Sequence, residues 1–258
     1  MELIDSHAHI VPPWFNKDER IKQIKQKAQE QGVKYIVNCA INPTQYDFAI
    51  DLAKKQQNFL VKLGIAPQGI ERPGMNIEDA FKGIEKYIKE IVAIGEIGLD
   101  YHWIKDTEGR KKQEEIFIRA IQLANNHNKP IVIHSRKAEQ ECINILKKHA
   151  KVDVVLHCFA GTLSQGMESL DHGWVISIPT AVTNRRKHRE LARKIPLESL
   201  IIETDSPFLA PTPYVSAKTK NEPAFVIYAA KSISELKNTP IEDVAAETFR
   251  TTKRIFKL

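Results

Sequence analysis

The sequence predicts an α/β fold, and within that class a closed TIM barrel, (β/α)8. Short apolar runs rich in β-branched residues recur along the 258 residues, and polar segments with helical periodicity separate them. Strict alternation of this kind indicates parallel strands joined by helical crossovers, and eight such units are what the barrel requires. A doubly wound open sheet is the alternative. No glycine-rich nucleotide-binding motif follows the first strand, which removes support from the nucleotide-binding forms of that alternative.

Each predicted element rests on its own stretch of sequence. The candidate strands are the apolar runs at residues 3–4, 35–37, 59–65, 91–99, 131–133, 152–156, 174–178 and 200–204. The candidate helices include the periodic polar segments at residues 20–31, 77–90, 113–125, 139–149, 224–237 and 241–256. Residues 207–223 contain four prolines among polar residues, so we expect a long loop over the C-terminal face of the barrel.

Composition indicates a globular protein with an ordinary core. Hydrophobic residues make up 42% and charged residues 27%, and the length suits one domain spanning residues 1–258. The first ten residues hold acids and histidines instead of an apolar signal region, so we expect a cytoplasmic protein with no membrane partner. The net charge of +6 favours an anionic partner such as nucleic acid, and no feature calls for an obligate protein partner.

Cysteine usage bears on the kind of metal site that the chain could hold. Cys39, Cys142 and Cys158 form an odd number without CxxC spacing. This pattern argues against a disulfide scaffold and against a cysteine-based zinc site. We therefore expect all three cysteines in the core.

Four histidines fall where apolar strands end. His7 and His9 follow the first strand, and residues two apart in a strand point to the same side, so both rings could bind one metal ion. His134 comes directly after the fifth apolar run, and His157 directly after the sixth. Any one of them alone fits a hydrogen-bonded core histidine at least as well. Their shared position at strand ends favours a metal site.

Two carboxylates complete this set. Glu96 lies in the apolar stretch 94–101, where an unpaired charge would be costly and a metal ion would neutralise it. Asp205 ends the eighth run, with Glu203 one step inward on the same side. Taken singly, each acid could equally serve a salt bridge, a strand end or a helix N-cap. In a closed barrel, the four histidines, Glu96 and Asp205 would meet at the C-terminal mouth.

Six donors are too many for one tetrahedral site, but they suit two divalent ions about 3.5–4 Å apart that share a bridging carboxylate. One ion would take His7, His9, Glu96 and Asp205, and the other would take Glu96, His134 and His157. Imidazoles favour zinc, manganese, cobalt or iron over calcium, and open positions would also admit magnesium. With a metal-activated water and Asp205 as proton acceptor, the set predicts a hydrolase whose catalytic residues are Asp205 and Glu96.

Three residues near these strand ends are candidates for substrate binding. Arg136 lies two positions after His134, where its guanidinium could bind a phosphate. Tyr101 and His102 follow Glu96 closely, and aromatic rings there could stack on a base or a sugar. Packing on the barrel rim is the alternative for His102.

Two groups of basic residues extend this list. Lys218 and Lys220 lie in the proline-rich loop, where they could bind phosphates. The run at residues 185–194 holds six arginines and lysines with one glutamate, after the seventh strand. Such a run is typical of a solvated helix face, but its first residues could also meet phosphates.

Six short motifs occur in order along the chain. They are residues 5–9 (DSHAH), 95–101 (GEIGLDY), 133–136 (IHSR), 157–161 (HCFAG), 203–211 (ETDSPFLAP) and 221–223 (NEP). Together with the ending at residues 254–256 (RIF), they resemble the TatD family of metal-dependent deoxyribonucleases. The resemblance covers most of the chain, and the set of motifs is highly specific.

The resemblance implies a TIM barrel of the metal-dependent hydrolase (amidohydrolase) type, with the same six residues as metal ligands. It also implies a nuclease that trims single-stranded DNA or RNA from the 3′ end. The chain departs from the family pattern at residues 217–220, which read AKTK where the family is more basic, and at Thr251, which replaces a common asparagine.

Our leading hypothesis is a metal-dependent phosphodiesterase that acts as a 3′–5′ exonuclease on single-stranded DNA, or on RNA. A second hypothesis is a hydrolase of esters or amides on the same metal pair, such as a D-aminoacyl-tRNA deacylase. A third is a nucleic-acid-binding scaffold without catalysis, which the intact ligand set argues against. The ligands themselves do not separate the first two hypotheses.

Overall fold

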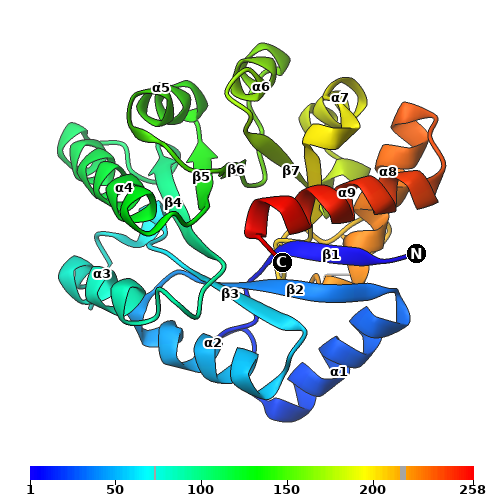
Figure 1. Ribbon diagram of the computed structural model, residues 1–258, viewed down its shortest axis with the longest axis horizontal. Coiled ribbons are helices and arrows are strands. Elements are labelled where there is room, and N and C mark those ends of the chain that lie inside the picture. Colours follow the sequence, from blue (N-terminus) through cyan, green and yellow to red (C-terminus); the bar gives the residue numbers. More distant parts are fainter. Residues whose placement is uncertain (73, 216–218) are drawn as a thin grey trace.

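The computed structural model describes residues 1–72, 74–215 and 219–258, and these residues form a nearly closed barrel. Eight parallel strands lie in sequence order within one sheet, with helices around them (Figure 1). The strands are β1 (Leu3–Ala8), β2 (Val33–Ala40), β3 (Phe59–Leu63), β4 (Ala93–Asp100), β5 (Ile131–Arg136), β6 (Val154–Leu156), β7 (Val175–Pro179) and β8 (Leu200–Glu203). The predicted fold class is confirmed. That the chain is a single domain stays a prediction.

Helices follow the strands in regular alternation. They are α1 (Asp18–Glu30), α2 (Pro43–Lys55), α3 (Ile77–Lys86), α4 (Thr107–His127), α5 (Glu139–His149), α6 (Leu163–Leu170), α7 (Arg186–Lys194), α8 (Val226–Lys237) and α9 (Ile241–Phe256). Short 3-10 turns occur at Pro67–Gly69, Thr180–Thr183, Leu197–Ser199 and Pro223–Phe225. None of the described helices is both long and apolar enough to cross a membrane.

Side-chain caps fix where several helices begin. The Asn42 side chain accepts a hydrogen bond from the Thr44 amide, and Pro43 occupies the first turn of α2. Asp106 caps α4 by accepting from the Gly109 amide at 2.8 Å. A capping box of Thr162 and Gln165 starts α6, with each side chain bonded to the backbone of the other residue. These caps determine the residue at which α2, α4 and α6 each begin.

The barrel closes just beyond the ends of β1 and β8. Ala8 and Ser206 form a parallel bridge there. The Asp205 amide donates to the His7 carbonyl at 2.8 Å, and the His9 amide donates to the Ser206 carbonyl at 2.7 Å. This seam brings the two ends of the barrel sheet together at the C-terminal mouth.

The buried carboxylate of Asp5 also stabilises the seam between β1 and β8. Asp5 accepts hydrogen bonds from the Thr204 amide at 2.8 Å and from the Thr204 hydroxyl at 2.6 Å. Burial raises the pKa of Asp5 to about 7, although the hydrogen bonds from Thr204 and His7 act in the opposite direction. Both residues are fully buried, so their hydrogen bonds replace water that the seam excludes.

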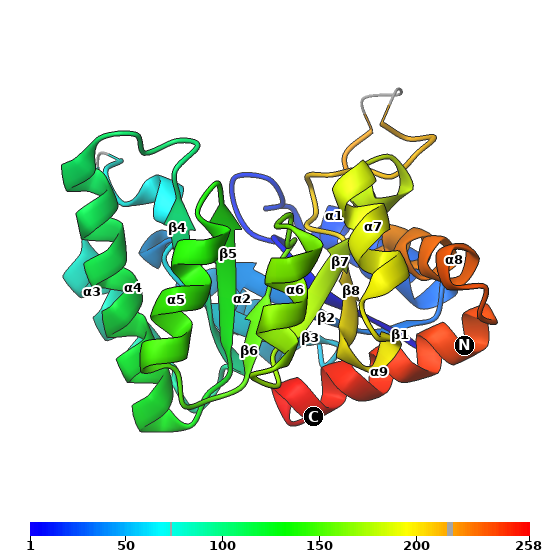
Figure 2. The same cartoon turned by 90° about the horizontal axis from the view of Figure 1, so that it is seen from above.

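The N-terminal end of the barrel is closed by apolar side chains. Helix α9 lies across this end, as Figure 2 shows. Its residues Ile255 and Phe256 pack against the inward-facing side chains Ile4, Val37 and Val132. This plug makes the lower half of the barrel interior a hydrophobic core.

The interior becomes polar toward the other end. The Lys62 ammonium donates to the Ser6 carbonyl at 2.8 Å. The hydroxyl groups of Ser6 and Ser177 lie 3.2 Å apart, and Ser177 donates to the Glu203 carboxylate at 2.5 Å. A hydrogen-bonded polar layer therefore separates the apolar plug from the mouth of the barrel.

Truncation of the plug tests its contribution to stability. We expect Phe256→Ala to lower the free energy of unfolding by about 3 kcal/mol, because a buried aromatic ring is replaced by a cavity. Urea unfolding followed by circular dichroism measures this change. The matched control is Leu258→Ala, two residues further along at 37% exposure, which should change stability by less than about 1 kcal/mol. Equal losses of unfolding free energy in the two variants would show that Phe256 does not contribute to stability as part of this apolar core.

Candidate metal centre

The histidines of β1 meet at the barrel mouth. His7 lies in β1, and His9 follows that strand on the same side. Their Nε2 atoms lie 3.2 Å apart, and both rings are buried. The Nδ1 atom of His9 donates to the Cys39 carbonyl at 3.0 Å, which turns its Nε2 toward the barrel axis.

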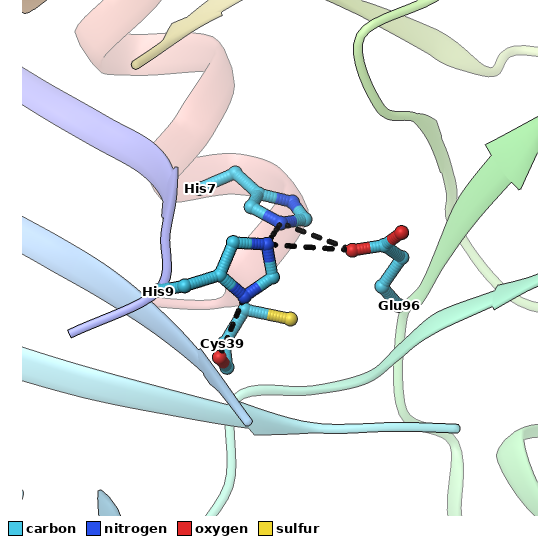
Figure 3. A group of neighbouring side chains, drawn as sticks. All are labelled: His7, His9, Cys39 and Glu96. Atoms are coloured by element: carbon cyan, nitrogen blue, oxygen red, sulfur yellow. Dashed lines mark hydrogen bonds and ion pairs between the residues drawn. The ribbon is translucent and has the colours of Figure 1, made fainter. Parts of the chain in front are cut away.

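Glu96 reaches these histidines from β4. One carboxylate oxygen, Oε2, lies 3.4 Å from His7 Nε2 and 3.6 Å from His9 Nε2 (Figure 3). The other oxygen, Oε1, lies 2.6 Å from His134 Nδ1 on β5. Glu96 thus directs its two oxygens to two different histidine groups, as the predicted bridging role requires.

The backbone of β4 explains how Glu96 comes so close to His134. The pairing of β4 with β5 shifts register between Gly95 and Ile97, which leaves Glu96 in a bulge. Gly98 has a φ of +144°, and a Cβ there would lie 2.1 Å from the His134 carbonyl. Only glycine permits this approach of the two strands.

Asp205 and His157 complete the cluster from the far side of the barrel. Asp205 Oδ1 lies 3.4 Å from His9 Nε2, 3.8 Å from His7 Nε2 and 3.9 Å from His157 Nε2. The rings of His7 and His157 stack with centroids 3.6 Å apart. His157 Nδ1 donates to Glu203 at 2.9 Å, so its Nε2 also faces the cluster. All six predicted ligand side chains therefore converge, although their role as ligands stays a prediction.

Opposite charges control the electrostatics around His134. Its Nε2 lies 2.9 Å from Asp100, so the ring sits between two carboxylates. Burial lowers the pKa of His134, but Glu96 and Asp100 outweigh burial and raise that pKa to about 10. For Glu96, burial raises the pKa, but the interactions with His134 and His7 hold it well below the usual carboxyl value. The surroundings of His134 thus stabilise positive charge on its ring.

Cys39, which was predicted only as a core residue, lies next to the cluster. It is fully buried, and its sulfur lies in the same group of potential ligand atoms as His7, His9 and Glu96, all within 4.8 Å of one another (Figure 3). The thiol contacts the Gly95 carbonyl at 3.5 Å. An isolated cysteine in an apolar strand gives no sequence signal of this position.

A cavity of about 510 Å³ opens above the cluster. Its floor includes five of the six predicted ligands, namely His9, Glu96, His134, His157 and Asp205. Its rim carries the rings of Trp14, Trp103 and Phe208 and the guanidinium groups of Arg72, Arg136 and Arg185. The cavity therefore joins a polar, ligand-rich floor to a rim of aromatic and cationic side chains.

Comparison with known proteins gives this arrangement a family. A family model of TatD related DNases matches residues 4–257. The chain belongs to this family. The metal-dependent hydrolase YabD of Bacillus subtilis, described as uncharacterized, is 32% identical over 262 residues, which cover 99% of each chain. Human deoxyribonuclease TATDN3 is 31% identical over 264 residues, which cover 98% of this chain and 94% of the human protein.

Solved structures agree with the sequence relatives. YjjV, a TatD homologue from Escherichia coli k12, superimposes with a TM-score of 0.88 at 26% identity, covering 99% of this chain and 98% of YjjV. An uncharacterized amidohydrolase from Saccharomyces cerevisiae gives a TM-score of 0.80 at 16% identity over 99% of both chains, which bears on the fold alone. The chain is a metal-dependent hydrolase of the TatD family, and its buried cluster contains side chains that could hold a metal ion.

The predicted substrate residues occupy different places in this TatD-type barrel. Arg136 lines the cavity, whereas its described lining includes Trp103 and neither Tyr101 nor His102. Tyr101 lies under the Arg110 guanidinium, 4.3 Å from its ring centroid, and His102 packs edge-on against Trp103. The substrate roles of Tyr101 and His102 stay predictions.

A turn after β4 explains why Trp103 reaches the cavity. The Asp100 carboxylate accepts hydrogen bonds from the amides of His102 and Trp103, at 2.9 and 3.0 Å. Lys220 lines one hollow that shares Arg185 and Leu209 with the cavity and another that includes residues of α1 and α8, and Lys218 lies outside the described residues. Local turn chemistry of this kind does not show in strand periodicity.

The rim residue Phe208 is held by the NEP motif. The buried Asn221 side chain donates to the Phe208 carbonyl at 2.6 Å and to the Thr204 carbonyl at 2.7 Å. Phe208 packs against Trp14 with ring centroids 5.3 Å apart and remains 44% exposed. Trp14 and Phe208 were missed by the sequence analysis because both lie in loops without periodicity.

The support of His157 by Glu203 can be tested through metal affinity. We expect Glu203→Gln to weaken metal binding about 10- to 100-fold, because the carboxylate that orients His157 is replaced by a neutral amide. Competition with a chromophoric chelator measures the affinity. Glu19→Gln, an exposed change on α1, is the control and should leave the affinity unchanged. An unaltered affinity in Glu203→Gln would show that His157 needs no such support.

Proposed function

We propose that the chain is a two-metal nuclease that removes nucleotides from the 3′ end of single-stranded DNA. The observation that carries this proposal is the cavity, which combines a floor of histidine and carboxylate donors with a rim of arginines and aromatic rings. The donors suit a hydrolytic metal centre, and the rim suits phosphates and bases. Human TATDN3, which is named a deoxyribonuclease, supports the same assignment.

The donor set fits two divalent cations. Glu96 directs one oxygen toward His7 and His9 and the other toward His134, so it would bridge the two ions. Asp205 would complete the first site, and His157 would complete the second. Imidazole and carboxylate donors suit zinc or manganese, and magnesium fits where water supplies the remaining ligands. When bound, the ions supply Lewis-acid activation of water and neutralise charge on the phosphate.

Asp205 is the group that we propose as proton acceptor. Its side chain is 14% exposed, compared with 4% for Glu96, so it is the more accessible carboxylate of the cluster. It also lines the cavity floor, within reach of a water molecule there. A carboxylate in this position can orient the attacking water and take up its proton at an Oδ atom.

The rim would bind the strand through two kinds of contact. Arg72, Arg136 and Arg185 present guanidinium groups that can hold phosphate oxygens in paired hydrogen bonds. Trp14 and Phe208 offer exposed ring surface on which a terminal base can stack. Stacking on these rings requires an unpaired base, which favours a single strand over a duplex.

The same metal centre could hydrolyse a carboxylic ester or amide, including the ester bond of a D-aminoacyl-tRNA. The three rim arginines favour a phosphodiester, because a carboxylic ester carries no negative charge for them to neutralise. Aminoacyl-tRNA also carries phosphates that the arginines could bind. It is therefore included among the substrates to be tested.

Digestion of labelled strands tests the proposal. We expect metal-loaded protein to shorten a 5′-labelled single-stranded oligonucleotide in steps of one nucleotide, since cleavage starts at the 3′ end. Denaturing gels follow the products. We expect Asp205→Asn to lower the rate about 10²- to 10⁴-fold, because the proton acceptor is lost. If the labelled nucleotide is released first, the protein digests from the 5′ end and the proposed polarity is wrong. If the protein deacylates aminoacyl-tRNA and releases no nucleotide, the proposed nuclease activity is wrong.

The bridging role of Glu96 predicts a change in metal stoichiometry. We expect the wild-type chain to bind two divalent ions and Glu96→Gln to bind fewer, because the amide is a weaker and less charged ligand for both sites. Plasma emission analysis of dialysed protein measures the ratio, and circular dichroism checks the fold. Two tightly held ions in Glu96→Gln would contradict a bridging carboxylate.

A further inference from the structure

Two further hollows lie beside the cavity over the cluster. Arg185 and Leu209 line both the cavity and a second hollow of about 400 Å³. Asn184 lines both this second hollow and a third one of about 500 Å³. Because neighbouring hollows share these residues, the three lie next to one another, from the cavity to the surface of α7.

Four of the six residues that line the third hollow are cations. Its remaining lining residues are Arg186, Arg189, Glu190, Arg193 and Lys194. The three arginines are spaced at i, i+3 and i+7, so they lie along one face of α7. Within residues 1–72, 74–215 and 219–258, none of these four cations forms an ion pair.

The charges at the N-terminal end of α7 are unfavourable for the isolated helix, although Arg193 and Lys194 in its last turn favour the helix dipole. The first turn of α7 holds Arg186 and Lys187 and no acidic residue, and cations at this end oppose the helix dipole. Like charges three or four residues apart also repel each other. No described side chain caps the N-terminus of α7. A polyanion bound along this face would offset the repulsion between the arginines and the unfavourable interaction with the helix dipole.

We propose that the body of a single-stranded nucleic acid leaves the metal centre through the second hollow and lies along α7, with its phosphates on Arg186, Arg189 and Arg193. This inference rests on the proposed nuclease function and adds a second binding surface to it. Helix α7 has nine residues and is about 13 Å long, so the surface accommodates a few nucleotides beyond the terminal one. With the 3′ end at the metal centre, these are the nucleotides on its 5′ side.

The proposal predicts a specific change in salt dependence. We expect the triple variant R186Q/R189Q/R193Q to bind a single strand more weakly and to reduce the slope of log affinity against log salt by about 2, or about 0.7 for each lost phosphate contact. The probe is a fluorescein-labelled oligothymidylate with uncleavable phosphorothioate linkages, bound to metal-loaded protein and followed by anisotropy. Arg193→Gln alone should change the slope by about 0.7.

A matched control removes the same charge from the other end of the barrel. Lys55, Lys148 and Lys151 are exposed and lie at or just beyond the C-terminal ends of α2 and α5, away from the mouth. We expect K55Q/K148Q/K151Q to leave the salt slope unchanged. Equal slope losses in the two triple variants would overturn the proposal, because net charge alone would then explain binding.

Kinetics on short and long strands separate this proposal from the proposed function. We expect R186Q/R189Q/R193Q to lower kcat/KM for the long strand while a dinucleotide, too short to reach α7, is cleaved at the wild-type rate. An unchanged ratio of long to short activity would overturn the path along α7. A wild-type chain that binds the strand with the expected slope but cleaves no oligonucleotide would refute the nuclease function alone. A duplex that binds as tightly, with the same loss in the variant, would overturn the assignment to a single strand.

Discussion

The rest of the structure depends on the seam where the barrel closes between β1 and β8. The Asp205 amide bonds to the His7 carbonyl there, and the Asp5 carboxylate holds Thr204 through two hydrogen bonds. These contacts join residues about 200 positions apart in the sequence. Because the contacting residues adjoin or include predicted ligands, closing the barrel at this seam also brings His7 and His9 to Asp205. A barrel that opened at this seam would separate His7 and His9 from Asp205.

The second constraint is the balance of charge in a buried space. His134 lies between Glu96 and Asp100 and takes a raised pKa from them, while burial and the neighbouring His157 and Lys62 hold the pKa of His7 well below its usual value. The pKa values of His134 and His7, which both lie a few ångströms from Glu96, are thus shifted in opposite directions. Metal ions would remove this conflict, because neutral imidazoles and ionised carboxylates are the forms that bind them. The hydrogen bonds of His9 to Cys39 and of His157 to Glu203 already fix the orientation in which each Nε2 is free to do so.

The sequence was enough to predict the barrel and the convergence of its polar strand ends, because parallel strands deliver their C-terminal residues to one mouth. It placed β1 only at residues 3–4, whereas the strand extends to Ala8, since Asp5 and His7 are buried polar residues, which an apolar pattern does not reveal. It listed no helix at α2 or α6, which begin at caps. The sequence did not predict the positions of Trp14, Phe208 and Trp103. Turns, loop hydrogen bonds and ring packing orient these side chains, and such contacts exist only in the folded chain.

The turn after β8 links the chemistry of the mouth to the surface beside it. Asp205 adopts a left-handed backbone conformation with a φ of +59°, which turns the chain out of the barrel directly after the seam. The following residues Phe208 and Leu209 then line the cavity, and Leu209 also lines the hollow that leads to α7. Thr180 donates to the Leu209 carbonyl at 2.7 Å, so the 3-10 turn before α7 is attached to the same segment. One hydrogen-bonded turn therefore positions a cluster carboxylate, a ring at the rim and the start of the path along α7. The hydrogen bonds of Thr180 and Asn221 therefore connect the start of this path to the residues that follow Asp205.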